Sequence, residues 1–322
     1  MSKVLLSVRD LASYFFLQEG VLKAVDSVSF DIGENETVAL VGESGCGKTI
    51  VALSLINLIP SPGRIVSGQV LLSGEDIVTA PKERLRAIRG RETGFVFQEP
   101  GAALNPVYTV GYQIREVLEL HRNLTRFEAE KEAVHLLGAT GIPDPERRAK
   151  SYPFQLSGGM RQRAAIAMAI STRPKLLIAD EPTTALDVTV QAEILDLLLG
   201  LQEQYRMAIL IITHDLGVVA QIARRVLVMY AGKLVESAPV EALFSSPKHP
   251  YAQGLLDSVR LRADRRAPLR GIPGSVPDLL RLPSGCSFHP RCAVGDVSCQ
   301  RAFPPMVPLS DDRSCACYKV ER

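Results

Sequence analysis

Hydrophobic and polar positions along this chain follow two alternating patterns. Short apolar runs at 37–41, 176–180 and 208–213 have the length and composition of buried strands. Longer segments at 127–137 and 190–204 carry apolar residues at helical spacing, so they predict helices with one buried face. Because strand and helix patterns alternate through the second half of the chain, we predict an α/β fold with a mostly parallel sheet covered by helices.

The pattern also separates regions of different secondary structure. Near the start of the chain, β-like runs at 4–8 and 24–30 predict an N-terminal antiparallel β subdomain. Further runs predict a helix at 48–59 and a strand at 225–232. Residues from about 101 to 152 read mostly helical, including 115–124, and they interrupt the strand pattern. We therefore predict an inserted helical subdomain at about 101–165.

The character of the chain changes after about Val240, where prolines become frequent. We place a domain boundary there, with a first domain at 1–240 and a C-terminal extension at 241–322. The extension contains an arginine-rich segment at 260–270, which is typical of a solvated linker, followed by a cluster of cysteines.

Composition narrows the classes of function. The 322 residues, 46% of them hydrophobic, suffice for a large buried core, and the net charge of +2 gives no reason to expect nucleic acid as a partner. No run approaches the ~20 apolar residues of a membrane span, and the N-terminus lacks the layout of a signal peptide. We therefore expect a cytosolic protein.

One stretch, GESGCGKT at 42–49, fits the phosphate-loop pattern G-x-x-x-x-G-K-[ST] and lies between an apolar strand and a helical segment. Gly45 and Gly47 allow backbone N–H groups to turn inward around phosphate oxygens. Lys48 has the reach to contact the β- and γ-phosphates, and the Thr49 hydroxyl is a ligand for Mg²⁺. The sequence therefore predicts a nucleotide site.

Further polar residues follow apolar strands. In the stretch LLIADEP, an apolar strand ends in two adjacent carboxylates, Asp180 and Glu181. Because neighbouring strand residues point in opposite directions, we expect the two acids to have different roles. Asp180 would hold Mg²⁺ through water, and Glu181 would act as general base or orient the attacking water. Gln98 carries an amide that can contact both the Mg²⁺ and the attacking water. His214 lies where strand ends converge on the phosphate site of an open α/β sheet. Alone, each also fits an ordinary solvated strand end or a structural histidine.

A second glycine-rich motif, LSGGMRQR at 156–163, precedes another helical segment. Ser157 supplies a hydroxyl, Gly158 and Gly159 supply accessible backbone amides, and the helix directs its positive end toward an anion. The simpler alternative is a helix N-cap, because serine is a common capping residue.

Taken in order, these motifs resemble the ATP-binding cassette (ABC) family, the ATPase subunits of membrane transporters, over about residues 5–256. The resemblance implies a P-loop NTPase fold with a RecA-like core, and ATP and Mg²⁺ as cofactors. It also implies that the Ser157 motif, the family signature, contacts the γ-phosphate of a nucleotide bound to a partner chain. Residues 185–187 match the D-loop, and His214 matches the switch histidine.

The resemblance assigns roles to individual residues. Phe15 best matches the aromatic that stacks on adenine, with Tyr14 and Phe16 as neighbouring alternatives. The implied nucleotide contacts are Phe15, Gly42, Glu43, Ser44, Gly45, Cys46, Gly47, Lys48, Thr49, Ile50, Gln98, Ser157, Gly158, Gly159, Asp187 and His214. The implied catalytic residues are Lys48, Gln98, Glu181 and His214, and the implied magnesium ligands are Thr49, Gln98 and Asp180.

Longer stretches resemble one subfamily, the dipeptide and oligopeptide importer ATPases, some of whose members move nickel or other small solutes. The stretches are GFVFQEPGAALNPVYTVG, IADEPTTALDVTVQAEIL, THDLGVVAQIARRVLVMYAGKLVE and SPKHPYAQGLL. This resemblance implies an ATPase at the cytoplasmic face of the membrane that drives peptide uptake. The implied partners are a second ATPase subunit, identical or paralogous, two membrane-spanning permease subunits and an extracytoplasmic solute-binding protein.

The C-terminal cysteines also match that subfamily, in which such a cluster binds [4Fe–4S]. The resemblance implies Cys286, Cys292, Cys299 and Cys317 as ligands, with Cys315 as an extra thiol or a substitute. Their spacing alone leaves iron–sulfur, zinc and unligated thiols open, because thiolate ligation suits either metal.

Two other classes of protein are alternatives to an importer ATPase. A soluble cassette ATPase that acts on nucleic acid or ribosomes usually carries a coiled-coil insertion or a duplicated cassette, and neither is found in this sequence. A non-catalytic scaffold would lack the lysine, the base or the histidine, whereas Lys48, Glu181 and His214 are all present. The sequence therefore favours the importer ATPase.

Overall fold

The computed structural model describes residues 3–184, 186–263 and 271–320. It divides into two compact units. The first comprises Met1–Leu5, Ile32–Glu36 and Thr79–Ile212, and the second comprises Leu6–Asp31, Thr37–Val78 and Thr213–Arg322. Both units combine strands with helices, which confirms the predicted α/β class. The predicted boundary between residues 240 and 241 stays a prediction.

Three parallel strands form the sheet of the first unit, in the order β8 (Ala208–Thr213), β7 (Leu176–Asp180) and β6 (Thr93–Val96). Strands β7 and β8 are buried at every position, as expected when both faces of a parallel sheet are covered. Their bounds are the predicted ones. The carboxyl end of β7 delivers Asp180, and Glu181 follows it.

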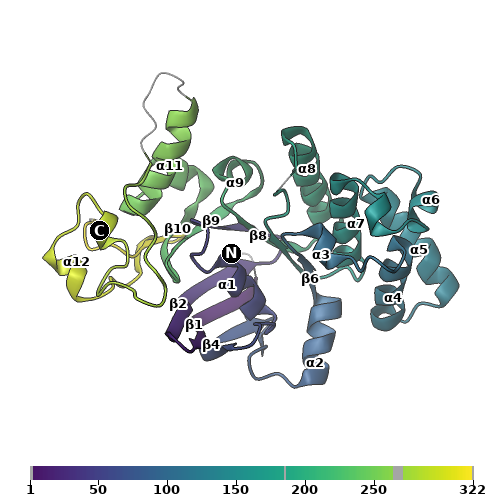
Figure 1. The fold of residues 1–322 in the computed structure, drawn as a ribbon, viewed down its shortest axis with the longest axis horizontal. Coiled ribbons are helices and arrows are strands. Elements are labelled where there is room, and N and C mark those ends of the chain that lie inside the picture. Colours follow the sequence, from purple (N-terminus) through teal and green to yellow (C-terminus); the bar gives the residue numbers. More distant parts are fainter. Residues whose placement is uncertain (1–2, 185, 264–270, 321–322) are drawn as a thin grey trace. The chain divides into compact units, whose positions relative to one another are not determined.

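Most of the remaining first unit is helical. In chain order they are α2 (Lys82–Ala87), a π-helix (Ile88–Glu92), α3 (Pro100–Ala103), α4 (Val110–Arg122), α5 (Arg126–Ala139), α6 (Pro145–Ala149), a 3₁₀ turn (Pro153–Gln155), α7 (Gly158–Ile170) and α8 (Val188–Tyr205). Helices α4 to α7 lie together in one helical group between β6 and β7 in the chain (Figure 1). This group matches the predicted helical insertion.

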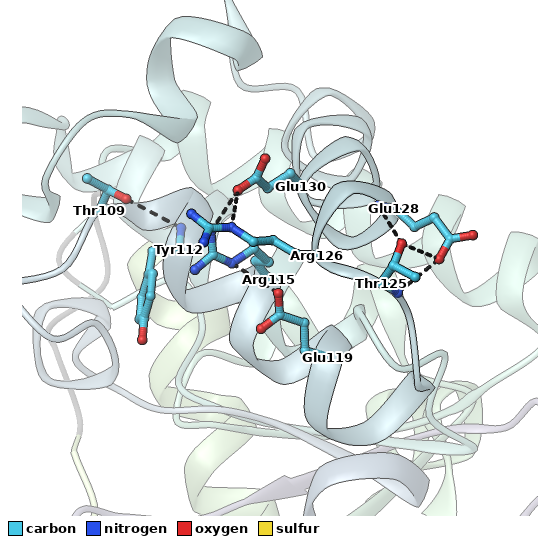
Figure 2. Close-up of polar contacts among 8 residues, drawn as sticks. All are labelled: Thr109, Tyr112, Arg115, Glu119, Thr125, Arg126, Glu128 and Glu130. Carbon is cyan, nitrogen blue, oxygen red and sulfur yellow. Dashed lines mark hydrogen bonds and ion pairs between the residues drawn. The ribbon is translucent and has the colours of Figure 1, made fainter.

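Helix α4 shows why this group folds as it does. Val110, Ile114 and Leu118 repeat every four residues and are fully buried, so they form one apolar face that packs against α5. Polar contacts fix the other face. Arg115 bonds to Glu130 of α5 at 2.7 Å and pairs with Glu119 of its own helix at 3.3 Å (Figure 2).

Both helices begin at capping threonines. The Thr109 hydroxyl accepts a hydrogen bond from the Tyr112 N–H at the start of α4. At the start of α5, Thr125 and Glu128 form a reciprocal capping box, in which each side chain accepts from the other residue's backbone N–H (Figure 2). Helix α4 ends at Arg122, two residues before the predicted end at 124, because Asn123 adopts a left-handed backbone that stops it.

Two groups of strands lie mainly in the second unit. An antiparallel sheet has the order β2 (Gly20–Gly33), β1 (Val4–Leu17), β4 (Gly63–Leu72) and β5 (Glu75–Asp76), which confirms the predicted antiparallel subdomain. A mixed group has the order β11 (Val307–Ser310), β12 (Arg313–Cys315), β10 (Lys233–Pro239), β9 (Arg225–Tyr230) and β3 (Thr37–Val41). Strands β3 and β9 are parallel, whereas β10, β11 and β12 add antiparallel pairs.

The second unit contains several short helices, and one of them, α1, is shorter than the sequence pattern predicts. They are α1 (Lys48–Leu55), α9 (Leu216–Ile222), α10 (Val240–Ser245), α11 (Pro250–Ala263), a 3₁₀ turn (His289–Arg291) and α12 (Val297–Arg301). Helix α1 ends at Leu55 rather than at the predicted residue 59, because Asn57 adopts a left-handed backbone that helices do not continue through.

The first residues of the arginine-rich segment at 260–270 belong to α11, which continues to Ala263, so the linker interpretation was wrong there. Residues 264–270 lie outside the described residues. No helix within the described ranges is both long enough and apolar enough to cross a membrane.

Candidate functional site

The phosphate loop connects β3 to α1, as the motif predicts. Gly45 and Gly47 have positive φ angles of 80° and 105°, in the region that favours glycine. A Cβ atom added to Gly47 would lie 2.0 Å from the carbonyl oxygen of Ala24, and one added to Gly42 would lie 2.3 Å from that of Met229. Gly47 is therefore required by both its backbone turn and its close packing, Gly45 by its turn, and Gly42 by its close packing.

Lys48 holds the loop in a compact form. Its Nζ donates to the carbonyl oxygens of Gly42 at 2.8 Å and Glu43 at 3.1 Å, and the side chain is buried. Ser44, Gly45 and Thr49 are exposed, whereas Cys46 is fully buried. Burial raises the pKa of the Cys46 thiol, so this residue packs as a small neutral side chain.

Three consecutive aromatics end β1, and their surroundings differ. The Tyr14 hydroxyl donates to Asp26 at 2.8 Å, and the guanidinium of Arg64 lies 4.4 Å from the centre of the exposed Phe16 ring. Phe15 is half-buried, and a Cβ on Gly63 would lie 2.6 Å from its ring. The Phe15 ring is therefore supported by Gly63 and retains some exposure, which suits stacking on a base.

His214 directly follows β8 and belongs to the second unit. Its imidazole is exposed. The next residue, Asp215, donates its N–H to the Thr213 hydroxyl at 3.0 Å and caps α9 by accepting from the Gly217 N–H at 2.7 Å. The backbone on the C-terminal side of His214 is thus fixed by the start of a helix.

In the first unit, Gln98 and Glu181 meet directly although they are distant in the sequence. The Gln98 Nε2 donates to the Glu181 Oε2 at 3.0 Å, and the Thr184 hydroxyl donates to the same oxygen at 2.8 Å. Glu181 has a φ of 47°, which is uncommon for a residue with a side chain and recurs at functional sites. Its N–H donates to the Ile212 carbonyl oxygen at 2.8 Å, which ties it to β8.

Asp180 and Glu181 lie in different surroundings, as the strand pattern predicts. Asp180 ends β7 and is 2% exposed, whereas Glu181 is half-buried. A buried carboxylate requires partners with positive charge or N–H donors, and a divalent cation is one such partner. The two acids therefore suit two different roles.

Ser157 begins α7 and caps it. Its hydroxyl accepts a hydrogen bond from the Met160 N–H at 3.3 Å, so Ser157 does cap this helix, as the simpler alternative predicted. Ser157 and Gly158 are nevertheless exposed. A Cβ on Gly159 would lie 3.0 Å from a methyl group of Val190, so this glycine allows α7 to approach α8 closely.

The predicted D-loop precedes α8. Ala185 lies outside the described residues. Asp187 is the N-cap of α8, and its carboxylate accepts from the Val190 N–H at 2.9 Å. Val190 also contacts Gly159, so the signature and the D-loop residue Asp187 are adjacent in this unit.

Four cysteines line one small cavity in the C-terminal region. They are the predicted set Cys286, Cys292, Cys299 and Cys317. The cavity has a volume of about 10 Å³, room for about one water molecule. The alternative ligand, Cys315, is buried in β12 and is not among the lining residues.

The thiols of this cavity influence one another. Burial and the neighbouring thiols raise the pKa of Cys286 to about 11, and burial also raises the pKa of Cys292 and Cys317. Metal binding would therefore release protons from these groups. Among the side chains that the structure describes, no group of three or more His, Cys, Asp or Glu has the geometry of a metal site. The predicted [4Fe–4S] cluster remains a hypothesis.

Two residues that the sequence reasoning did not assign contact the phosphate loop. Tyr251 accepts a hydrogen bond from the Glu43 N–H at 2.9 Å, and Arg291 pairs with the Glu43 carboxylate at 2.7 Å. Tyr251 lies in the quoted stretch SPKHPYAQGLL and Arg291 in GCSFHPRC. The distinctive sequence of these stretches was the available signal.

Comparison with family models gives two matches on this chain. The model described as "ABC transporter" matches residues 25–184. The model described as "Oligopeptide/dipeptide transporter, C-terminal region" matches residues 235–299. The two matches follow one another without overlap.

Similar proteins cover nearly the whole chain. The oligopeptide transport ATP-binding protein AppD of Bacillus subtilis is 47% identical over 318 residues, which span 98% of this chain and 97% of AppD. A Brucella melitensis protein named as a peptide import ATP-binding protein is 48% identical over 327 residues, covering 98% of this chain and 97% of the relative.

Solved structures show the same fold. A dimeric structure of the ATP-binding cassette MJ0796, in a post-hydrolysis state bound to ADP and Pi, has a TM-score of 0.66 and 27% identity, covering 73% of this chain and 98% of that one. The cbiO1 protein of Clostridium perfringens, part of an ABC transporter complex, has a TM-score of 0.65 and 27% identity, covering 82% of this chain and 97% of that one.

Proposed function

This chain belongs to the ABC transporter family, and on that premise we propose that it is the ATPase subunit that drives uptake of dipeptides and oligopeptides. The observation that carries the proposal is the succession, in one chain, of a cassette and an oligopeptide-transporter C-terminal region. Likeness over 98% of the chain to AppD supports the same conclusion. The protein is an ATPase of the ABC type.

In the proposed site, the residues of the phosphate loop bind the nucleotide. Backbone amides that follow Glu43 in the loop, up to Thr49, surround the β-phosphate, Lys48 exchanges its carbonyl partners for phosphate oxygens, and Phe15 stacks on adenine. The Thr49 hydroxyl and the buried Asp180 carboxylate are oxygen donors of the kind Mg²⁺ prefers. When bound, Mg²⁺ neutralises charge on the phosphates.

Glu181 takes the role of general base for the attacking water. Its carboxylate accepts hydrogen bonds from Gln98 and Thr184 through Oε2, and these two bonds orient the carboxylate that takes the proton. Gln98 thereby holds the base as well as offering its amide to the water and the metal. His214 contacts the γ-phosphate.

The signature serves the nucleotide of a second chain. Ser157 and Gly158 are exposed at the N-terminal end of α7, where the helix dipole favours an anion. Asp187 accompanies them at the same surface. ATP binding therefore stabilises the closed dimer, and hydrolysis releases it, because only a ligand with different affinity for two states shifts their populations.

The proposed partners are a second cassette, identical or paralogous, two permease subunits and an extracytoplasmic solute-binding protein, with this chain at the cytoplasmic face of the membrane. Reconstitution tests this function. The chain is assembled in proteoliposomes with candidate permease subunits and its partner ATPase. Peptide-loaded binding protein should stimulate ATP hydrolysis and peptide uptake together. Stimulation by a nickel complex or another solute, and not by peptides, would instead assign a different cargo.

We further propose that Cys286, Cys292, Cys299 and Cys317 hold a [4Fe–4S] cluster. The support is that these four thiols line one cavity, since iron–sulfur clusters take thiolate ligands. Lys319, which lines the same cavity and pairs with Asp296, places a positive charge beside an anionic thiolate cluster.

Protein purified without oxygen should be brown and contain iron and sulfide in comparable amounts. Cys286→Ser should lose both the colour and the iron, because it removes one of the four thiolates. Cys315→Ser is the matched control, since Cys315 is buried nearby but does not line the cavity, and it should keep the iron. Colourless protein with zinc, or with no metal, would rule the cluster out.

A further inference from the structure

Glu43, the second residue of the phosphate loop, is held on two sides by the C-terminal region. Its backbone N–H donates to the Tyr251 hydroxyl at 2.9 Å. Its carboxylate receives two bonds from Arg291, from Nη1 at 2.7 Å and from Nη2 at 3.2 Å. Both partners follow the loop by more than two hundred residues in the chain. The loop's conformation therefore depends on residues outside the cassette motifs.

The guanidinium of Arg291 donates hydrogen bonds from all three of its nitrogens. Besides Glu43, it donates from Nε to the Pro273 carbonyl oxygen at 2.8 Å, from Nη2 to that of Ile272 at 3.3 Å, and from Nη1 to the Tyr230 hydroxyl at 3.2 Å. These bonds use the five N–H donors of a guanidinium. The side chain is 6% exposed, so water replaces these partners poorly. A lysine has neither the number nor the planar arrangement of these donors.

Tyr251 is fixed equally firmly. The side chain is fully buried, and its ring packs against Tyr230 and Phe288 at centroid distances of 4.6 and 5.4 Å. Its N–H donates to the Nδ1 of His249 at 3.1 Å. Burial lowers the pKa of His249 to about 4, so the imidazole is neutral near pH 7 and accepts this bond. The Tyr251 hydroxyl is thus a rigid partner for the loop.

We propose that Arg291 and Tyr251 are positioning residues for nucleotide binding, which makes the C-terminal region part of the ATP site. A phosphate loop binds well when its amides already point inward, because ordering a loop on binding lowers affinity. Holding Glu43 by both its backbone and its carboxylate fixes the first turn of this loop. The effect acts through Glu43, so it changes nucleotide affinity more than the chemical step.

Glu236 and Arg313 provide a matched comparison within the same region. Arg313 bonds to the fully buried Glu236 at 2.8 Å, and its side chain is 11% exposed. This pair joins β12 to β10 and does not include a phosphate-loop residue. If Arg291 merely anchored the C-terminal region to the rest of the unit, substitution of either arginine would have the same consequences.

The test measures ATP affinity, kcat, KM and thermal unfolding for full-length variants. Arg291→Gln should raise the Kd and KM for ATP about tenfold, or about 1.4 kcal/mol, with kcat within about twofold. Arg291→Lys should recover part of the affinity. Glu43→Gln should behave like Arg291→Gln, and the double variant should add little to either, because both remove one interaction. Arg313→Gln should lower the Tm and leave KM unchanged.

The proposal is overturned if folded Arg291→Gln binds ATP like the unaltered protein, or if Arg313→Gln raises KM equally. If Arg291→Gln does not fold, Tyr251→Phe replaces it, since it removes only the hydroxyl that accepts from Glu43, and unchanged affinity there would overturn the proposal as well. The inference rests on the proposed phosphate loop, and Lys48→Met tests that separately. Normal ATP binding by Lys48→Met would refute the site itself, whereas failure of Arg291→Gln alone to change affinity would refute only the positioning.

Discussion

Replacing Glu181 by glutamine should lower ATP turnover by a factor of about 10²–10⁴ and leave Mg-ATP binding intact. Glutamine preserves the shape and accepts the hydrogen bonds from Gln98 and Thr184, but it cannot take a proton from water. The chain should therefore accumulate with ATP bound. Steady-state phosphate release and equilibrium nucleotide binding, measured on the same preparation, separate these effects.

The control for this variant is Glu99→Gln, which changes an exposed carboxylate next to Gln98 and should keep normal turnover. Thr184→Val offers a second check. Loss of the 2.8 Å bond should leave Glu181 less well oriented and lower kcat with little change in KM. Normal turnover by Glu181→Gln would reject Glu181 as the base.

Placing arginine at Ser157 should lower turnover by a factor of about 10² or more, the scale of losing well-placed donors to a transition state. The substitution puts a large side chain at the exposed start of α7 and removes a hydroxyl and a helix cap. The phosphate loop belongs to a different part of the same chain, so each variant chain should still bind ATP. Turnover should therefore fall while ATP binding is retained, as is also expected for Glu181→Gln.

Loss of the cap complicates that result, because capping itself contributes about 1 kcal/mol to stability. Ser157→Asp is the matched variant. It retains a cap on α7, yet it presents a negative charge to the partner's phosphate and should also lower turnover. If Ser157→Asp turned over ATP normally, Ser157 would be a structural cap and nothing more.

The sequence predicted the local elements well because their signals are local. The strands at 37–41, 176–180 and 208–213 were identified to the residue, since each is a short apolar run buried on both faces. Helix ends were less accurate. The apolar pattern continued past Leu55, but the left-handed backbone at Asn57 ends the helix, and periodicity carries no information about such a stop.

Contacts between distant residues were harder to predict. The roles of Gln98 and Glu181 were predicted from their places after apolar strands and agreed with the resemblance, but their 3.0 Å contact depends on β6 and β7 being neighbours in the sheet. The bond between Arg291 and Glu43 could not be predicted from the sequence, because the two residues are 248 positions apart and only the folded second unit brings them together. Of the candidate cysteines, Cys315 differs from the other four because it lies in β12 and does not line the cavity.

In the proposed mechanism, the nucleotide site of one chain is completed by the signature of another. Size-exclusion chromatography with light scattering tests it on the Glu181→Gln chain, alone and mixed with its paired cassette. With Mg-ATP, this chain should form a dimer, and adding Ser157→Arg to both chains should leave ATP bound but abolish the dimer. A dimer of undiminished stability with Ser157→Arg in both chains would contradict the account.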